Sequence, residues 1–173
     1  MPLLVVFGGL PATGKTTLSR ELARRLSASY IRIDTIEQTL KAAGLAVGAT
    51  GYTIANALAA ENLKLDRTVI ADCVNPALAS RQGWRETALR YRARLVEIEI
   101  VCSDLAEHRR RVESRIADIE GLIQPKWQEV MDHDYEPWDR DRLVLDTAGK
   151  SIGDLTDLAE AYLRRCSAAT GAT

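Results

Sequence analysis

Four residues near the start of the chain have the types and the spacing needed to hold a phosphate group. Gly9, Gly14, Lys15 and Thr16 fit the pattern G-x-x-x-x-G-K-[ST] in full. The glycines let the backbone turn its N–H groups inward around an anion, and Lys15 would reach the outer phosphates as a point charge. The Thr16 hydroxyl would bind Mg²⁺. The pattern therefore predicts a binding loop for a nucleoside triphosphate.

The residues on either side supply the elements that such a loop requires. The apolar run 3–7 predicts a strand before the loop, and Leu18, Leu22 and Leu26 recur after it at the spacing of one helix face. The positive end of that helix would face the same anion. This context argues against a plain glycine-rich turn. The expected nucleotide contacts are Gly9, Ala12, Thr13, Gly14, Lys15, Thr16 and Thr17.

Two aspartates follow predicted strands, Asp34 after 30–33 and Asp72 after 68–71. In parallel sheets, ligands bind beyond the carboxyl ends of the strands, so both side chains are expected beside the loop. Asp72 ends a run that resembles the second nucleotide-binding motif of P-loop proteins, whose aspartate contacts Mg²⁺ directly or through water. Asp34, ionised at neutral pH, could accept the proton of an attacking hydroxyl. The alternative for each is an ordinary helix cap or turn residue.

A basic run further along the chain offers a cationic partner for the transferred group. Arg111 and Arg115 are four residues apart in a predicted helix that begins at Asp104, so they would share one face. Phosphoryl transfer depends on positioning and on neutralising charge, which is what this pair could supply. The alternative is a solvated basic face.

The rest of the chain alternates between strand and helix patterns. Further strands are predicted at 95–101 and 142–145, and further helices at about 35–43, after a loop at 44–51, at 76–91 and from Ser151. This alternation predicts an α/β fold with a parallel sheet covered on both faces. Glu97 and Glu99 interrupt the apolar pattern of their strand, which indicates a partly covered face or a place near the edge.

Length and composition predict one domain of residues 1–173 with a net charge of -1. The balanced charge argues against nucleic acid as a partner. Cys73, Cys102 and Cys166 lack metal or redox spacing. No run is long enough to cross a membrane and no signal peptide is visible, so we expect a cytoplasmic protein without a membrane partner. Oligomeric state leaves no signal in the sequence.

Taken together, the loop, Asp34, the 72–75 turn with Arg81, and the Arg111/Arg115 pair resemble a family of small P-loop kinases. That group includes gluconate kinase, adenylylsulfate kinase, chloramphenicol phosphotransferase, the zeta toxins and AAA-domain or zeta-toxin-like ATPases of bacteria. The resemblance implies a P-loop NTPase three-layer sandwich, with a five-stranded parallel sheet in the order 2-3-1-4-5 and a lid. It also implies ATP–Mg²⁺ as donor and a small hydroxylated molecule as acceptor.

The resemblance also assigns roles to individual residues. Asp34 would be the base or the acceptor-binding group, and Arg111 and Arg115 would belong to a lid segment at about 108–141. Ala148 and Gly149 would lie near the adenine. The expected acceptor-site residues are Asp34, Asn75, Arg81 and Tyr135, and aromatic side chains at 120–141 would form a lid or an acceptor wall, or else simply pack a long loop.

One departure limits what can be transferred from these relatives. Several members carry an arginine three residues after the strand-2 aspartate, where this chain has Glu37. The acceptor of adenylylsulfate kinase or of the zeta toxins therefore cannot simply be carried over.

Three functions remain open on the sequence. The first is a kinase for a hydroxyl of an antibiotic, sugar, nucleoside or metabolite. The second is a polynucleotide 5′-kinase, for which a local patch of arginines between 81 and 94 would be needed. The third is a regulatory ATPase without a small-molecule acceptor. The guanine-specific motif N-K-x-D is absent from the sequence, which argues against a GTPase.

Overall fold

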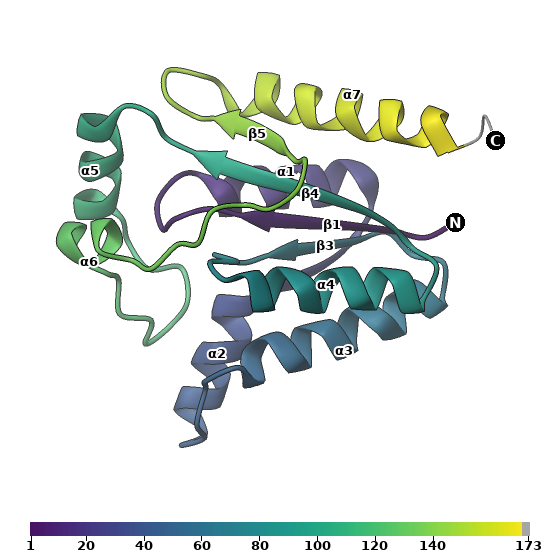
Figure 1. Ribbon diagram of the computed structural model, residues 1–173. Coiled ribbons are helices and arrows are strands. Elements are labelled where there is room, and N and C mark those ends of the chain that lie inside the picture. The colour runs from purple at the N-terminus through teal and green to yellow at the C-terminus, as the bar shows by residue number, and fades with distance from the viewer. Residues whose placement is uncertain (171–173) are drawn as a thin grey trace.

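The computed structural model describes residues 1–170 of the chain and the side chains of residues 1–167 (Figure 1). Its centre is a five-stranded sheet in the order β2-β3-β1-β4-β5, with every neighbouring pair parallel. The strands are β1 (Leu3–Gly8), β2 (Ser29–Arg32), β3 (Val69–Asp72), β4 (Arg94–Val101) and β5 (Leu143–Asp146). The predicted strand order 2-3-1-4-5 is therefore confirmed.

Helices form two layers around this sheet and a cap at one end of it. They are α1 (Lys15–Leu26), α2 (Ile33–Ala42), α3 (Thr50–Lys64), α4 (Leu78–Arg90), α5 (Leu105–Ser114), α6 (Trp127–Met131) and α7 (Ile152–Thr170). In Figure 1 all strand arrows point toward α5 and α6, which lie beyond the carboxyl ends of the strands. Within residues 1–170, none of the helices has the length and apolarity needed to cross a membrane.

The central strand β1 explains the two layers, because its side chains alternate between the faces. Val5 and Phe7 pack against α1 and α7, whereas Leu4 and Val6 pack against α3 and α4. All four side chains are fully buried. A strand that is apolar on both faces is typical of the middle of a parallel sheet.

The two glutamates of β4 are buried and paired with arginines, and their strand is not at the edge of the sheet. β4 lies between β1 and β5, and Glu97 and Glu99 keep 7% and 8% of their surface exposed. Arg85 of α4 binds Glu97 at 3.1 Å, and Arg142 binds Glu99 at 2.6 Å. Arg85 also binds Asp139 at 2.8 Å. The polar alternation of this strand thus reflects charged partners in α4 and in the 132–142 segment.

Arg81 holds the 132–142 segment to the start of α4. Its side chain is fully buried, and its guanidinium donates to the backbone carbonyls of Asn75, Pro76, Glu136 and Pro137 at 2.7–3.1 Å. The indole of Trp138 lies 4.3 Å from it. The expectation that Arg81 binds an acceptor is therefore wrong, because the backbone uses its donors and no surface is left.

Several predicted boundaries shift by one or two residues. β2 ends at Arg32 and α2 begins at Ile33, which moves Asp34 from a strand end into the first helical turn. α4 begins at Leu78, so Pro76 precedes the helix and does not open it. The Asp104 side chain caps α5 as predicted, accepting hydrogen bonds from the two backbone N–H groups of Ala106 and Glu107.

We expect Arg81→Ala to lower the free energy of unfolding by about 3–5 kcal/mol, because the hydrogen bonds of a buried guanidinium to four backbone carbonyls would be lost. Urea unfolding followed by circular dichroism measures the change. Arg90→Ala is the matched control, since Arg90 is an exposed arginine of the same helix and its side chain makes no hydrogen bond or ion pair with the described residues. Equal stability of the two variants would contradict the role given to Arg81.

Candidate active site

The predicted loop leaves β1 at Gly8 and enters α1 at Lys15, and its glycines stand where the backbone requires them. Gly9 has φ +140°, and a Cβ there would lie 2.3 Å from the carbonyl oxygen of Ile100. Gly14 caps α1 with φ +96°, a left-handed conformation that costs glycine little. The two glycines that define the motif are thus fixed by backbone geometry.

The outer side of the loop is held by side chains from distant elements. His108 Nε2 lies 2.8 Å from the carbonyl oxygen of Pro11, and the hydroxyl of Thr147 donates to the carbonyl oxygen of Thr13 at 2.7 Å. Arg111 donates to the Thr147 hydroxyl at 2.8 Å and to its carbonyl oxygen at 3.1 Å. Sequence reasoning missed His108 and Thr147, because a lone histidine or threonine carries no motif.

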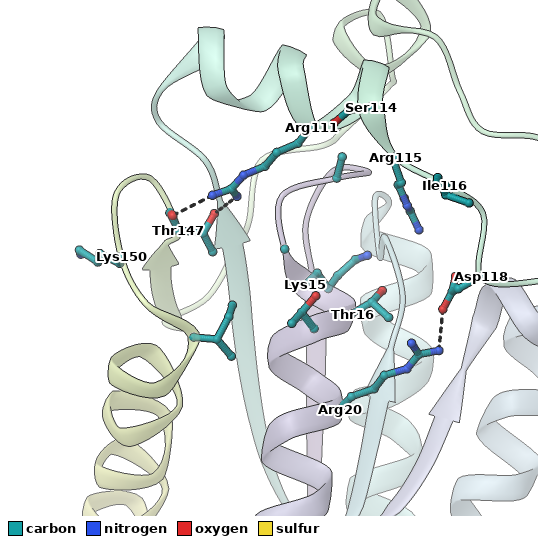
Figure 2. Close-up of a pocket in the computed structure, with 14 residues that line it drawn as sticks. Lys15, Thr16, Arg20, Arg111, Ser114, Arg115, Ile116, Asp118, Thr147 and Lys150 are labelled. Carbon is teal, nitrogen blue, oxygen red and sulfur yellow. Dashed lines mark hydrogen bonds and ion pairs between the residues drawn. The ribbon is translucent and has the colours of Figure 1, made fainter.

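A pocket of about 480 Å³ opens in front of the loop (Figure 2). Its walls are the first turns of α1, the end of α5 with the residues after it, and the turn after β5. The predicted residues that line it are Ala12, Gly14, Lys15, Thr16, Thr17, Arg111 and Arg115.

The other four residues predicted to contact the nucleotide lie next to the pocket and do not line it. Gly9 and Thr13 lie behind the pocket wall, where the Gly9 N–H donates to Val74 and the Thr13 hydroxyl to Leu10. Ala148 and Gly149 are flanked by Thr147 and Lys150, which do line the pocket.

Arg111 and Arg115 do not share a helix face, which corrects the prediction. α5 ends at Ser114, and Arg115 has an extended backbone with φ −67° and ψ 131°. Arg111 is bound to Thr147 and, at 2.5 Å, to Glu107. Arg115 instead points toward the loop in Figure 2 and makes no hydrogen bond or ion pair with any side chain among residues 1–167. Arg115 is thus the arginine left available for a phosphate.

Asp72 suits the magnesium ion that the motif implies, and Thr16, the other predicted ligand, lines the pocket. Asp72 is 1% exposed, and its Oδ1 lies 3.6 Å from Lys15 Nζ but accepts no hydrogen bond from the described residues. The Tyr30 hydroxyl donates to Oδ2 at 2.7 Å. A buried carboxylate oxygen without a donor is where a cation fits. Among residues 1–167, no group of three or more His, Cys, Asp or Glu side chains is placed to hold a metal ion.

Asp34 lies beside this centre and is not a helix cap. The N-cap residue of α2 is Arg32, and the Asp34 side chain makes no capping hydrogen bond. Arg32 Nη2 lies 3.3 Å from Asp34 Oδ2, and Arg32 Nε lies 3.8 Å from Asp72 Oδ2. Glu37 follows one turn later, and burial together with the charge of Asp34 raises its pKa. The two predicted carboxylates therefore meet at one arginine that sequence reasoning did not single out.

The other two acceptor-site predictions fall outside the pocket wall. Asn75 is buried with φ +54°, and its Oδ1 accepts a hydrogen bond from the Ser80 hydroxyl at 2.9 Å. The Tyr135 hydroxyl accepts a hydrogen bond from the Trp138 indole at 3.0 Å, and burial raises the pKa of Tyr135 to about 12. Both side chains thus belong to the packing around Arg81.

The predicted lid at 108–141 has two parts with different positions. Residues 115–126, between α5 and α6, border the pocket with Arg115 and Asp118, whereas residues 132–142 run along the sheet. Trp127 packs edge-on against His108 with ring centroids 5.3 Å apart. The aromatic residues therefore support the loop and the sheet, and they do not line the pocket.

Comparison with known proteins places the chain in a family. The model of the AAA domain family (AAA_33) matches residues 4–129. The chain belongs to this family. No curated protein matches it.

Solved structures show the same fold at low sequence identity. The APS kinase CysC of Mycobacterium tuberculosis, solved with AMPPNP and APS, has a TM-score of 0.73 at 18% identity, covering 94% of this chain and 98% of its own. A gluconokinase of Sinorhizobium meliloti has a TM-score of 0.67 at 19% identity, covering 95% and 93%. Kti12 of Chaetomium thermophilum, solved with ADP-AlF3, has a TM-score of 0.62 at 22% identity, covering 91% and 97%. The fold is thus that of the small P-loop kinases.

We expect Thr147→Val to weaken Mg–ADP binding about three- to tenfold, because the loop would lose the hydrogen bond to the Thr13 carbonyl. Isothermal titration calorimetry measures the affinity. Thr156→Val is the matched control, since among the described residues that buried hydroxyl bonds only to the Ile152 carbonyl of its own helix. An unchanged affinity in Thr147→Val would show that the loop does not need this support.

Proposed function

We propose that the protein is an ATP-dependent kinase that transfers the γ-phosphoryl group to a hydroxyl of a small molecule. Its main support is the position of Asp34. Arg32 contacts both Asp34 and Asp72, and Asp72 in turn contacts Lys15 of the phosphate loop. A site built only to hold a nucleotide needs the loop and Asp72. A carboxylate at Asp34, 28% exposed and not used as a cap, is what phosphoryl transfer to a hydroxyl adds.

The donor side of the site would bind ATP through the loop and α1. The inward N–H groups and the Lys15 ammonium would bind the phosphate oxygens, and Arg115 would bind the transferred group. Thr16 and Asp72 would hold Mg²⁺, which when bound neutralises charge on the phosphates. Lys15 and Asp72 are already in contact, so the cation and the ion-binding carboxylate are positioned before the nucleotide arrives.

The acceptor side would use Asp34 as the base. As the acceptor oxygen forms its bond to the γ-phosphorus, the bond from that phosphorus to the bridging oxygen breaks and ADP leaves. The hydroxyl proton passes to the Asp34 carboxylate and then to solvent. Arg32 at 3.3 Å orients this carboxylate.

The charge at this side favours a neutral or cationic acceptor over a strongly anionic one. Arg32 is already bound to carboxylates, and position 37 is occupied by Glu37 where several kinases of the resembled group carry arginine. An acceptor of the adenylylsulfate type would therefore lack the arginine that binds it at that position. Sugars, nucleosides and hydroxylated amines are the first compounds to test.

The structure weakens the case for a polynucleotide kinase. Of the arginines between 81 and 94, Arg81 and Arg85 are buried, and Arg94 is bonded to α7. Only Arg90 and Arg92 remain outside those contacts, and phosphate-backbone binding needs several clustered cations. A regulatory ATPase would bind ATP through the same residues as a kinase. Phosphate transfer to a hydroxylated compound therefore distinguishes the two functions.

We expect Lys15→Ala to abolish ATP turnover and Asp34→Asn to reduce acceptor phosphorylation by about 10²–10⁴ while leaving Mg–ATP binding intact. The reason is that Lys15 binds the phosphates, whereas Asp34 takes the proton, and the asparagine side chain keeps an oxygen that Arg32 can bind. Radiolabelled phosphate transfer to a panel of hydroxylated compounds, with calorimetry for ATP, measures both.

Asp66→Asn serves as the control, because it removes the charge of an aspartate that makes no hydrogen bond or ion pair through its described side chain. Transfer at the wild-type rate in Asp34→Asn would exclude Asp34 as the base. Turnover that survives Lys15→Ala would exclude the loop as the phosphate site.

A further inference from the structure

The 115–126 segment passes beside the phosphate pocket without regular secondary structure. Two of its large apolar side chains, Ile116 and Ile123, are 89% and 90% exposed, so they do not hold it in place. The segment nevertheless carries Arg115, the arginine turned toward the loop (Figure 2). Ile119 and Leu122 are half-buried, so the segment keeps some apolar contact, and its polar contacts decide what else holds Arg115 there.

Asp118 supplies one such polar contact. A single oxygen of its carboxylate lies 2.8 Å from Arg20 Nη2 of α1 and 2.8 Å from Arg32 Nη1 of β2. These two arginines, with the hydrogen bond from Arg32 foremost, hold the pKa of Asp118 down at about 2. The aspartate is therefore charged at any pH at which the enzyme would work, and the contact persists.

Arg32 connects this contact to the reacting groups. Its side chain is only 2% exposed, and the same guanidinium lies 3.3 Å from Asp34 and 3.8 Å from Asp72. Arg32 Nε is buried and has no hydrogen-bond partner among the described residues, so the ion pairs with carboxylates carry most of its stabilisation. A buried guanidinium that loses a carboxylate partner is destabilised and rearranges.

We propose that Asp118 is a positioning residue that holds the 115–126 segment to Arg20 and Arg32, so that Arg115 faces the phosphates while Arg32 faces Asp34. The inference rests on the proposed function for what Arg115 binds. The contact itself spans three parts of the chain that meet only in the folded protein, namely α1, β2 and the segment. When Asp118 is bound, the cation for the donor side and the carboxylate for the acceptor side are set by one network.

Limited trypsin digestion tests the positioning directly, because cleavage after Arg115 requires the segment to leave the pocket. We expect Asp118→Asn to be cleaved there about tenfold faster than the wild type, with or without Mg–AMPPNP. Arg20→Gln, which removes one of the two partners, should fall between them. Glu113→Gln is the matched control, since it breaks only an exposed pair with Arg109 on the neighbouring helix turn.

A binding cycle with a fluorescent, non-hydrolysable ATP analogue and Mg²⁺ tests whether Asp118 acts through Arg115. Asp118→Asn and Arg115→Ala should each lower the affinity for the analogue. The double variant should bind as tightly as the single variant with the lower affinity, because both substitutions remove the same contact. Asp118→Glu, which keeps the charge, should recover most of the affinity. Additive losses, or cleavage of Asp118→Asn at the wild-type rate, would overturn the inference.

These measurements need no acceptor. A failure to phosphorylate any hydroxylated compound would reject the proposed function and leave the positioning role of Asp118 supported by the digestion and the binding cycle. Conversely, transfer to an acceptor with additive losses in the cycle would reject the role of Asp118 and keep the kinase.

Discussion

The site depends on one loop whose backbone is held from its outer side, while the motif leaves its N–H groups for an anion. A backbone that leaves several donors unpaired can persist only if its other polar groups are well satisfied. Here the outward carbonyls of Pro11 and Thr13 have partners at 2.8 and 2.7 Å in His108 and Thr147. Those partners come from α5 and from the turn after β5, so the loop is shaped by elements 97 and 134 residues away in the sequence.

The same principle of satisfying buried polar groups organises the other half of the sheet. β4 carries two glutamates into the interior, and Arg85 and Arg142 meet them there. Nearby, Arg81 takes up four backbone carbonyls of two separate segments. Such contacts contribute less to stability than apolar burial of the same size, but they allow few alternative arrangements. They fix where the 132–142 segment lies, and so leave the pocket side to the 115–126 segment.

Features set by interactions between neighbouring residues could be predicted from the sequence, and features set by contacts between distant residues could not. The loop, the alternation of strands and helices and the place of Asp72 follow from local patterns, because glycine, a helix start and an apolar run act over a few residues. The strand order came from the family resemblance. The roles of Arg32 and Asp118 could not be predicted, since their pairing joins positions 86 residues apart. Arg81 was misassigned for the same reason, because its partners at 136 and 137 are more than fifty residues away in the sequence. Arg115 was placed on a helix face because nothing in the sequence marks the helix end at Ser114.

The contact at the end of β1 has a consequence for how this sequence can diverge. A Cβ on Gly8 would lie 2.7 Å from the indole of Trp138, so the ring occupies the volume that a side chain at position 8 would need. The two positions share one space. A homologue with a larger residue at position 8 must carry something smaller at position 138 or route that segment elsewhere, which would also release Arg81 from the ring that covers it. Substitutions at these two sites are therefore expected to occur as pairs, and a chain that keeps one residue should keep the other.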